Sequence, residues 1–434
     1  MNQVRAVFRE LPEPRQTATS HNLKSTLADA ATSAFSVGFT QRPSFLDYQI
    51  RRPTKFGKNN AQSSFGLHQL PSVSQVRNRL DSISPETVYP LFVKISEGLY
   101  HSGYLTAFCS LGDTRLMPID GTDWFSWEKL SSPGGNRQTL QNGKTLYRHT
   151  AVTPVLVAPG QSDVIPLPAE LGHPQDGPEK PDGELAAAQR WLNTWGSHYS
   201  PWGITLLGDD LYCHQPFCQA AINQGLPVWL VGKPDSHPLR YEWIADFERG
   251  GQRGTVETTR WNSKQRLTER SRYMNQVPLR DSDDALMLNW CERSVIDAKG
   301  QMVYQPAWAT THWISEEHVA QVAAAGRARW KVENEGNNVL KNRGSHFEPN
   351  FGHGKTPWSN WLATLIGLAY LIHTTFDGLD TAYHTVRRLL PSRRTLFEHL
   401  RALLQYLPFE SWEPLRKFML GGLDGTILDS TERF

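Results

Sequence analysis

Apolar side chains recur every three or four positions through much of the first 110 residues, which is the spacing of helices that bury one face. This spacing predicts helices over residues 26–35 and 87–104. Pro90 is compatible with the second helix, because proline is tolerated in a first helical turn. The segment PSVSQVRNRLDSI predicts a shorter helix, with Ser72 or Ser74 as its N-cap. The pattern therefore indicates a helical N-terminal region.

Between residues 114 and 231 the pattern changes to short apolar runs that lead into acidic residues. Residues 114–119 predict a short strand with Asp120 at its end. Residues 204–207 are almost all apolar, as in a strand buried on both faces, and lead through Gly208 to Asp209 and Asp210. The other elements expected here are a hairpin formed by residues 147–158 and 163–167, a helix over residues 184–199 and a buried strand over residues 227–231. Together they predict an α/β fold.

Residues 240–308 show short alternating strands separated by Gly turns, which predicts a β-rich insertion. Eight Arg or Lys residues but only two Glu lie between residues 249 and 280, so we expect the insertion to have a cationic surface. Residues 327–344 then predict a helix, because they contain no Pro and few β-branched residues. Arg329 and Glu333 are four residues apart and share a face of it. A loop rich in Gly, Pro and His follows.

The last part of the chain is again helical in pattern. Residues 358–375 predict a buried core helix, since the apolar run over 361–372 is too short to span a bilayer. Residues 381–423 predict further helices with basic residues between their apolar positions. We therefore expect no membrane partner.

Composition narrows the class of protein. The 434 residues are 39% hydrophobic and 20% charged, as in a globular protein long enough for two or three domains. The four Cys residues form no CxxC pair, which favours a reducing compartment without disulfides. Cys213, His214 and Cys218 lack a fourth zinc ligand, so no zinc site is predicted. The N-terminus lacks the apolar stretch of a signal peptide.

Local charge indicates a nucleic-acid partner although the net charge is only +2. Between residues 42 and 80 a single acid, Asp47, stands against seven cations. These are Arg42, Arg51, Arg52, Lys55, Lys58, Arg77 and Arg79. Such an excess is what a phosphate-binding surface needs, and the short helix that carries Arg77 and Arg79 is a plausible DNA reader. The alternative is a solvated basic loop.

Several carboxylates could carry chemistry. Asp120 stands at a strand end before Gly121, which suits a metal ligand but is also a common turn. Two adjacent acids after a buried strand are costly unless they are paired or bound to a cation, and periodicity cannot choose between Asp209 and Asp210. On the predicted helix, Glu335 lies close enough to compete with Glu333.

The run RWKVE…LKNRG…NFGHGK resembles the third signature block of DDE-type insertion-sequence transposases. In that group an Arg, the catalytic Glu four residues later and a Lys further on belong to one helix of an RNase H-like fold. They match Arg329, Glu333 and Lys341 here, and the Tyr that the group has before the Arg falls on Gly326. The blocks DGTDWFS and GDDLY resemble the first-Asp and second-Asp motifs.

The resemblance implies an RNase H-like mixed-sheet catalytic core in which Asp120, Asp209 and Glu333 hold two Mg²⁺ or Mn²⁺ ions. Arg329, Lys341 and Lys355 would then contact phosphates. The implied regions are a helical DNA-binding region (1–110), the first part of the core (111–239), a β-rich insertion (240–308), the second part of the core (309–378) and a helical C-terminal region (379–434).

The implied protein cleaves double-stranded DNA at the terminal inverted repeats of its element and joins the 3′-hydroxyl ends to target DNA. A homodimer on DNA is expected, because two ends must be paired, and so is a bacterial-type cytoplasmic, nucleoid-associated location. Two other functions share these features. One is an inactive, element-derived DNA-binding protein, and the other is an RNase H-like nuclease that cuts without joining.

Overall fold

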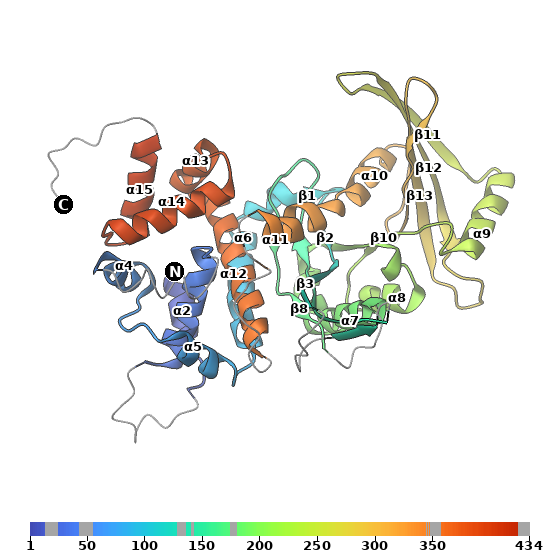
Figure 1. The fold of residues 1–434 in the computed structure, drawn as a ribbon. Helices are drawn as coiled ribbons and strands as arrows, with labels where there is room; N and C mark the ends of the chain where they lie inside the picture. The colour runs from blue at the N-terminus through green and yellow to red at the C-terminus, as the bar shows by residue number, and fades with distance from the viewer. Residues whose placement is uncertain are drawn as a thin grey trace.

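The computed structural model describes residues 1–13, 25–42, 55–127, 136–139, 143–173, 180–343, 345, 347 and 357–423. They form a mixed α/β fold in which a nine-stranded sheet lies beside a layer of helices built from both ends of the chain (Figure 1). One described helix, Trp358–Leu379, is long and apolar enough to cross a membrane, but 67% of its most apolar 18-residue stretch is buried within the fold.

The centre of the sheet consists of three parallel strands, β2 (Thr114–Pro118), β9 (Ile204–Gly208) and β10 (Val228–Val231). All three were expected from their apolar runs. A short hairpin, β6 (Val155–Leu156) and β7 (Ile165–Pro166), lies beside β2 through an antiparallel bridge between Leu116 and Val157. The β6–β7 pair forms a two-stranded sheet of its own, and the large sheet on this side has the order β1-β2-β9-β10, with β1 (Cys109–Ser110) paired to β2.

The first strand of the predicted hairpin, over residues 147–158, is divided in the structure. Its first part is β5 (Thr145–Val152), which belongs to a separate four-stranded sheet with β3 (Gly121–Trp127), β4 (Asn136–Thr139) and β8 (Glu170–Leu171). Only its second part, β6, forms the expected hairpin beside β2. Both parts lie close to the end of β2. β5 pairs with β3, which begins directly after Asp120, and β6 leads into the bridge with β2.

Helices cover both faces of the parallel strands. α7 (Lys180–Tyr199) and α8 (Gln215–Asn223) lie on one side (Figure 1). On the other side lie α10 (Val319–Arg327), a π-helical segment (Val332–Asn337) and α11 (Asn338–Asn342). Ala328 and Arg329 form a turn after α10, so the single helix expected over residues 327–344 starts later and contains a π-helical stretch.

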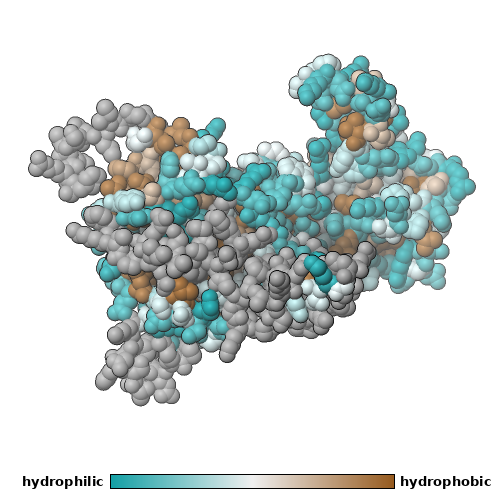
Figure 2. All heavy atoms as spheres, in the orientation of Figure 1, coloured by the Kyte–Doolittle hydropathy of each residue, from teal (hydrophilic) through white to brown (hydrophobic). Residues whose placement is uncertain are grey.

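The insertion begins with a helix, α9 (Pro238–Arg249), where only strands were expected. Pro238 at its first turn is the kind of start signal that proline provides. The strands that follow are β11 (Gly254–Trp261), β12 (Arg266–Pro278), β13 (Met287–Ile296), β14 (Met302–Tyr304) and β15 (Ala307–Thr310). β15 pairs with β10, so the insertion extends the central sheet. The projecting ends of β11 to β13 are largely hydrophilic (Figure 2).

The remaining helices come from the two ends of the chain. They are α1 (Asn2–Arg9), α2 (Leu27–Phe39), α4 (Lys55–Phe65), α5 (Val73–Leu80), α6 (Tyr89–His101), α12 (Pro357–Leu379), α13 (Thr381–Leu389), α14 (Arg393–Tyr406) and α15 (Trp412–Leu423), with short 3-10 turns at Pro85–Val88, Tyr104–Phe108 and Ser200–Trp202.

The N- and C-terminal helices pack together as one layer. The Asn60 amide in α4 donates to the carbonyls of Leu404 (2.8 Å) and Leu407 (2.7 Å), and its oxygen accepts the Phe409 N–H. α2 packs along α12, which also touches α5 and α6. The predicted helices of both regions are confirmed, and Ser72 rather than Ser74 is the N-cap of α5.

Candidate active site

Asp120 and Asp209 leave the sheet side by side. The parallel register places Pro118 opposite Leu207, and each acid lies two residues beyond its member of that pair. The Ile119 N–H donates to the Leu207 carbonyl at 2.9 Å, which continues the pairing to the last residue before Asp120. Both carboxylates are half-buried. Because carboxyl ends of parallel strands share one edge of a sheet, this arrangement follows directly from the two strands.

The two adjacent acids have different roles. Asp209 caps the 3-10 turn Asp210–Tyr212 by accepting the Leu211 N–H at 2.9 Å, and it lies within the field of Arg329. Asp210 turns toward the loop after β10, where its carboxylate accepts the Lys233 N–H at 2.7 Å and lies 3.3 Å from His237. The structure therefore separates the acid that faces Asp120 from the acid that holds a neighbouring loop.

Glu333 lies on the π-helical segment Val332–Asn337, one turn beyond Arg329. The Arg329 guanidinium donates to its Oε1 at 2.7 Å, so the expected pair on one helical face is present. Glu333 is close enough to Asp120 to act on its pKa. Glu335 instead lines a cleft against the C-terminal helices. Single π-helical turns often occur at functional sites, because they redirect side chains relative to an α-helix.

Negative charge is concentrated around Asp120. Burial is the largest cause that raises its pKa, followed by the charges of Glu184 and Glu333, and together with Asp209 they raise it to about 7 although Arg329 opposes them. Burial also raises the pKa of Asp209, and the Leu211 N–H and Arg329 oppose that rise. Like charges held this close favour either a proton or a bound cation.

Glu184 is an acid near Asp120 that no pattern along the chain singles out. It lies near the start of α7, and its Oε1 accepts the Gly121 N–H at 3.1 Å and the Tyr212 hydroxyl at 2.7 Å. It therefore joins the residue after Asp120 to the turn that Asp209 caps. Burial raises the pKa of Tyr212 well above its ordinary value, and the nearby Glu184 charge raises it further, so this hydroxyl keeps its proton for the hydrogen bond.

Gly121 has a different function from the turn expected of an Asp-Gly pair. It starts β3 and is not in the left-handed region that a tight turn would require. A Cβ atom at this position would collide with the carboxylate of Glu184. The glycine thus makes room for the fourth acid. A sequence pattern cannot show this, because the two residues are distant along the chain.

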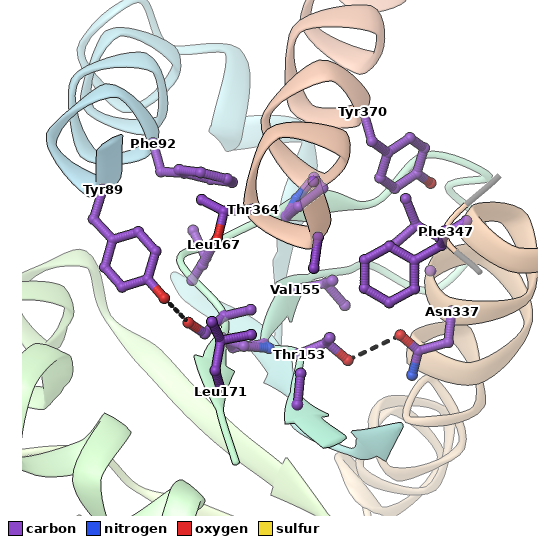
Figure 3. Close-up of a pocket in the computed structure, with 18 residues that line it drawn as sticks. Tyr89, Phe92, Thr153, Val155, Leu167, Leu171, Asn337, Phe347, Thr364 and Tyr370 are labelled. Atoms are coloured by element: carbon purple, nitrogen blue, oxygen red, sulfur yellow. Dashed lines mark hydrogen bonds between the residues drawn. The ribbon is translucent and has the colours of Figure 1, made fainter. Parts of the chain in front are cut away.

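A hydrogen-bonded link joins the Asp120 strand end to the π-helical segment. The Thr153 N–H donates to the Asp120 carbonyl at 3.0 Å, and the Thr153 hydroxyl lies 2.9 Å from the Asn337 side-chain oxygen. Both side chains are buried beside a small apolar pocket of about 40 Å³ between α6, α12 and the strands (Figure 3). Since buried polar groups need partners, this link fixes the distance between strand end and helix.

Of the cations expected to contact phosphates, Arg329 lies beside the acids. Lys341 donates to the Asp123 carbonyl, near the Arg148–Asp123 ion pair. Lys355 lies outside the described residues. Arg329 also lines a groove of about 460 Å³ together with Lys233, Arg327 and the exposed Trp330.

Gly326, which stands where the resemblance would place a Tyr, packs α10 closely against two indoles. A Cβ atom there would lie 2.6 Å from Trp229 Nε1 and 2.7 Å from Trp308 Cε2. The two tryptophans occupy the space that a larger side chain would need. The glycine that departs from the motif is therefore required by the close packing of Trp229 and Trp308.

The N-terminal cations have several different environments. Arg77 and Arg79 on α5 are half-buried; the Arg79 guanidinium donates to the carbonyls of Ser25 (2.6 Å) and Thr26 (2.9 Å), and Arg77 lies over the Trp358 ring. Arg42, expected on the DNA-binding surface, is buried and so cannot contribute to it as a surface charge. Lys58 is exposed. Arg51 and Arg52 lie outside the described residues, as does the side chain of Lys55.

The donor set near Asp120 consists of carboxylate oxygens, the ligands that Mg²⁺ prefers. Within the described part of the chain, no three Asp, Glu, His or Cys side chains form a ready-made metal cluster. Glu333 is turned to Arg329 in this arrangement, so a shared ion would require its carboxylate to exchange that partner. The four Cys residues are all free thiols, as expected.

The chain matches no protein-family model and no curated protein sequence.

Proposed function

We propose that the protein is a DDE-type transposase. It would bind the ends of its element, cleave the DNA by metal-assisted hydrolysis and join the 3′-hydroxyl ends to target DNA. The observation that carries this proposal is the placement of three acids from distant parts of the sequence in one region. Asp120 and Asp209 follow adjacent parallel strands, and Glu333, on the π-helical segment, pairs with Arg329 and is close enough to Asp120 to act on its pKa.

The strand arrangement supports an RNase H-like core. Such a core has a mixed sheet in which parallel strands adjoin an antiparallel pair, with helices on both faces. The parallel strands β2, β9 and β10, with the antiparallel β6–β7 pair attached to β2 through the Leu116–Val157 bridge, agree with such a core. α7 connects the two halves, and the insertion lies between the Asp209 strand and the Glu333 helix, where the resemblance expects it.

Asp120, Asp209 and Glu333 are the residues that would hold two Mg²⁺ or Mn²⁺ ions. When bound, such ions supply Lewis-acid activation of the attacking and leaving oxygens in phosphodiester transfer. The protein's own contribution begins with electrostatics: burial, followed by the charges of Glu184 and Glu333, raises the pKa of Asp120 to about 7, and a cation that displaced the proton would offset these effects. Glu184 and the Thr153–Asn337 link hold the strand ends and the helix in place.

DNA would approach the acids along cationic surface. Arg329 is placed to meet a phosphate once it releases Glu333, and Lys233 and Arg327 line the groove beside it. Trp330 offers an exposed ring on the same helix for contact with a base or sugar. We propose double-stranded DNA as the partner, a homodimer when two element ends are paired, and a bacterial-type cytoplasmic, nucleoid-associated location.

The test is a strand-transfer assay with the short inverted repeats that border the reading frame. End-labelled duplexes carrying these repeats are incubated with the protein, a supercoiled target plasmid and Mg²⁺. We expect nicked ends and labelled target, both lost in the presence of a chelator. Nicking without labelled target would indicate a nuclease that does not join ends. Binding with neither reaction would indicate an inactive DNA-binding protein.

A further inference from the structure

A second charged cleft lies on the other side of the Glu333 helix. It encloses about 1020 Å³ between α11, with the π-helical segment before it, and the corner where α13 meets α14. Glu335, Asn342 and Arg343 contribute to one wall, and arginines of the segment RRLLPSRR form the other. None of the residues that the resemblance assigned to chemistry lines it.

The charges in this cleft are unevenly partnered. Two of its acids have partners: Asp163 lies 3.9 Å from the Arg393 guanidinium, and the Asp377 carboxylate lies 3.1 Å from the His384 ring. Four further arginines of the lining have no ion-pair partner among the described residues. These are Arg343, Arg387, Arg388 and Arg394. Three of them, Arg343, Arg388 and Arg394, are exposed, so the excess positive charge lies where a ligand can reach it.

This concentration of arginines costs free energy in the protein alone. Arg394 occupies the first turn of α14, where the helix dipole disfavours a cation, and unlike Arg393 it has no acid paired with it among the described residues. Arg387 is half-buried, and its Nε atom is buried without a hydrogen-bond partner. Burial lowers the pKa of Arg387, and the nearby charge of Arg393 lowers it further. An anion in the cleft would relieve all three effects.

We infer that this cleft binds the phosphate backbone of double-stranded DNA. The inference rests on the proposed function and adds to it a second DNA contact, behind the catalytic helix. Arg388 and Arg394 lie on α13 and α14, and Arg343 directly follows α11. The cleft is far larger than one phosphate, which suits an extended backbone better than a free anion. Because α11 continues the segment that carries Glu333, DNA held here would brace that segment.

The test uses the full-length double variant Arg388→Gln/Arg394→Gln. Binding of a fluorescein-labelled duplex of mixed sequence is measured by anisotropy over a series of salt concentrations. Each lost phosphate contact should reduce the slope of log K against log salt by about 0.9, so the double variant should lose about two from the slope. The matched control, Arg249→Gln/Lys417→Gln, removes two exposed charges outside the cleft and should keep the wild-type slope.

A double variant that keeps the wild-type slope would contradict DNA binding in the cleft. A control whose slope decreases as much as that of the cleft variant would contradict it as well. If wild-type protein still nicks element ends in that case, the proposed function stands without the cleft. Wild-type protein that binds no duplex at any salt concentration would contradict both.

Discussion

The two strand-end acids and the helix acid are held by different means. Asp120 and Asp209 are half-buried, follow paired strands and are joined through Glu184. Glu333 is more open, with 45% of its side chain exposed, and its carboxylate pairs with Arg329, four residues earlier in the chain. Asp120 and Asp209, with Glu184 beside them, are held by contacts from several elements, and we call these three residues the acidic floor. Glu333, by contrast, can change partners. Under the proposed function, substrate and metal would therefore complete the site from the side of Glu333.

The largest effect should come from removing the exposed acid. Glu333→Gln should abolish nicking and joining while end binding stays near wild type, because the carboxylate supplies charge to the metal site and no expected DNA contact. Glu335→Gln, two residues away and lining the other cleft, is the matched control and should keep most of the activity. Single-turnover nicking of labelled ends measures both. The opposite ranking would assign the helix acid to Glu335.

The raised pKa of Asp120 should make the free energy of unfolding depend on pH. The ordinary pKa of Asp120 is 3.8 and the folded protein raises it to about 7. Between these values the folded state keeps a proton that the unfolded state has lost, so stability falls as pH rises through this window, by up to about 4 kcal/mol. Asp120→Asn removes this loss. Without divalent metal, it should be more stable than wild type at about pH 8 and show a smaller gain at about pH 5.

Urea unfolding at the two pH values provides the measurement, and Asp246→Asn on the exposed face of α9 is the control. A gain for Asp120→Asn that is the same at both pH values would argue against a raised pKa as its cause.

A smaller effect is expected from Glu184→Gln, which keeps the acceptor for Gly121 and Tyr212 but removes the charge. Since that charge helps to raise the pKa of Asp120, the variant should ionise Asp120 at lower pH. The pH at which Mn²⁺ binding reaches half its maximum should therefore decrease, as measured by calorimetry across a pH series. Glu97→Gln, far from the site, should leave the profile unchanged. An unshifted profile for Glu184→Gln would reduce Glu184 to a packing residue.

The smallest effect concerns the link between floor and helix. Thr153→Val keeps the shape of the side chain but removes the hydroxyl that contacts Asn337. The loss should cost about 1 kcal/mol of unfolding free energy, the usual contribution of one buried hydrogen bond. Chemical denaturation measures it, with Thr385→Val on the exposed part of α13 as the comparison. An equal loss of unfolding free energy in both variants would mean that the Thr153–Asn337 hydrogen bond stabilises the fold no more than the hydrogen bond of Thr385.

The strand ends were predictable and the supports around them were not. Apolar runs over 114–119 and 204–207 identify strands, and strand direction then brings Asp120 and Asp209 to one edge. Glu184 carries no local signal, because its importance depends on contacts with Gly121 and Tyr212 from other elements.

The helix around Glu333 was only partly predictable. Spacing identified the Arg329–Glu333 pair, but the π-helical turn depends on tertiary packing and leaves no distinct apolar period. Helix α9 had a local signal in Pro238, which the alternating pattern of the following strands outweighed. The burial of Arg42 could not be read from charge counting, which treats every Arg as a surface residue.

The central claim is that Asp209, and not its neighbour, completes the acidic floor beside Asp120. Single-turnover nicking of a labelled element end, with Asp209→Asn and Asp210→Asn at matched protein and Mg²⁺ concentrations, tests it most directly. We predict that Asp209→Asn loses nicking by orders of magnitude, while Asp210→Asn, whose carboxylate holds Lys233 and His237, keeps much of it. The reverse ranking would move the site to Asp210, and near-wild-type rates for both would remove this strand end from the catalytic site.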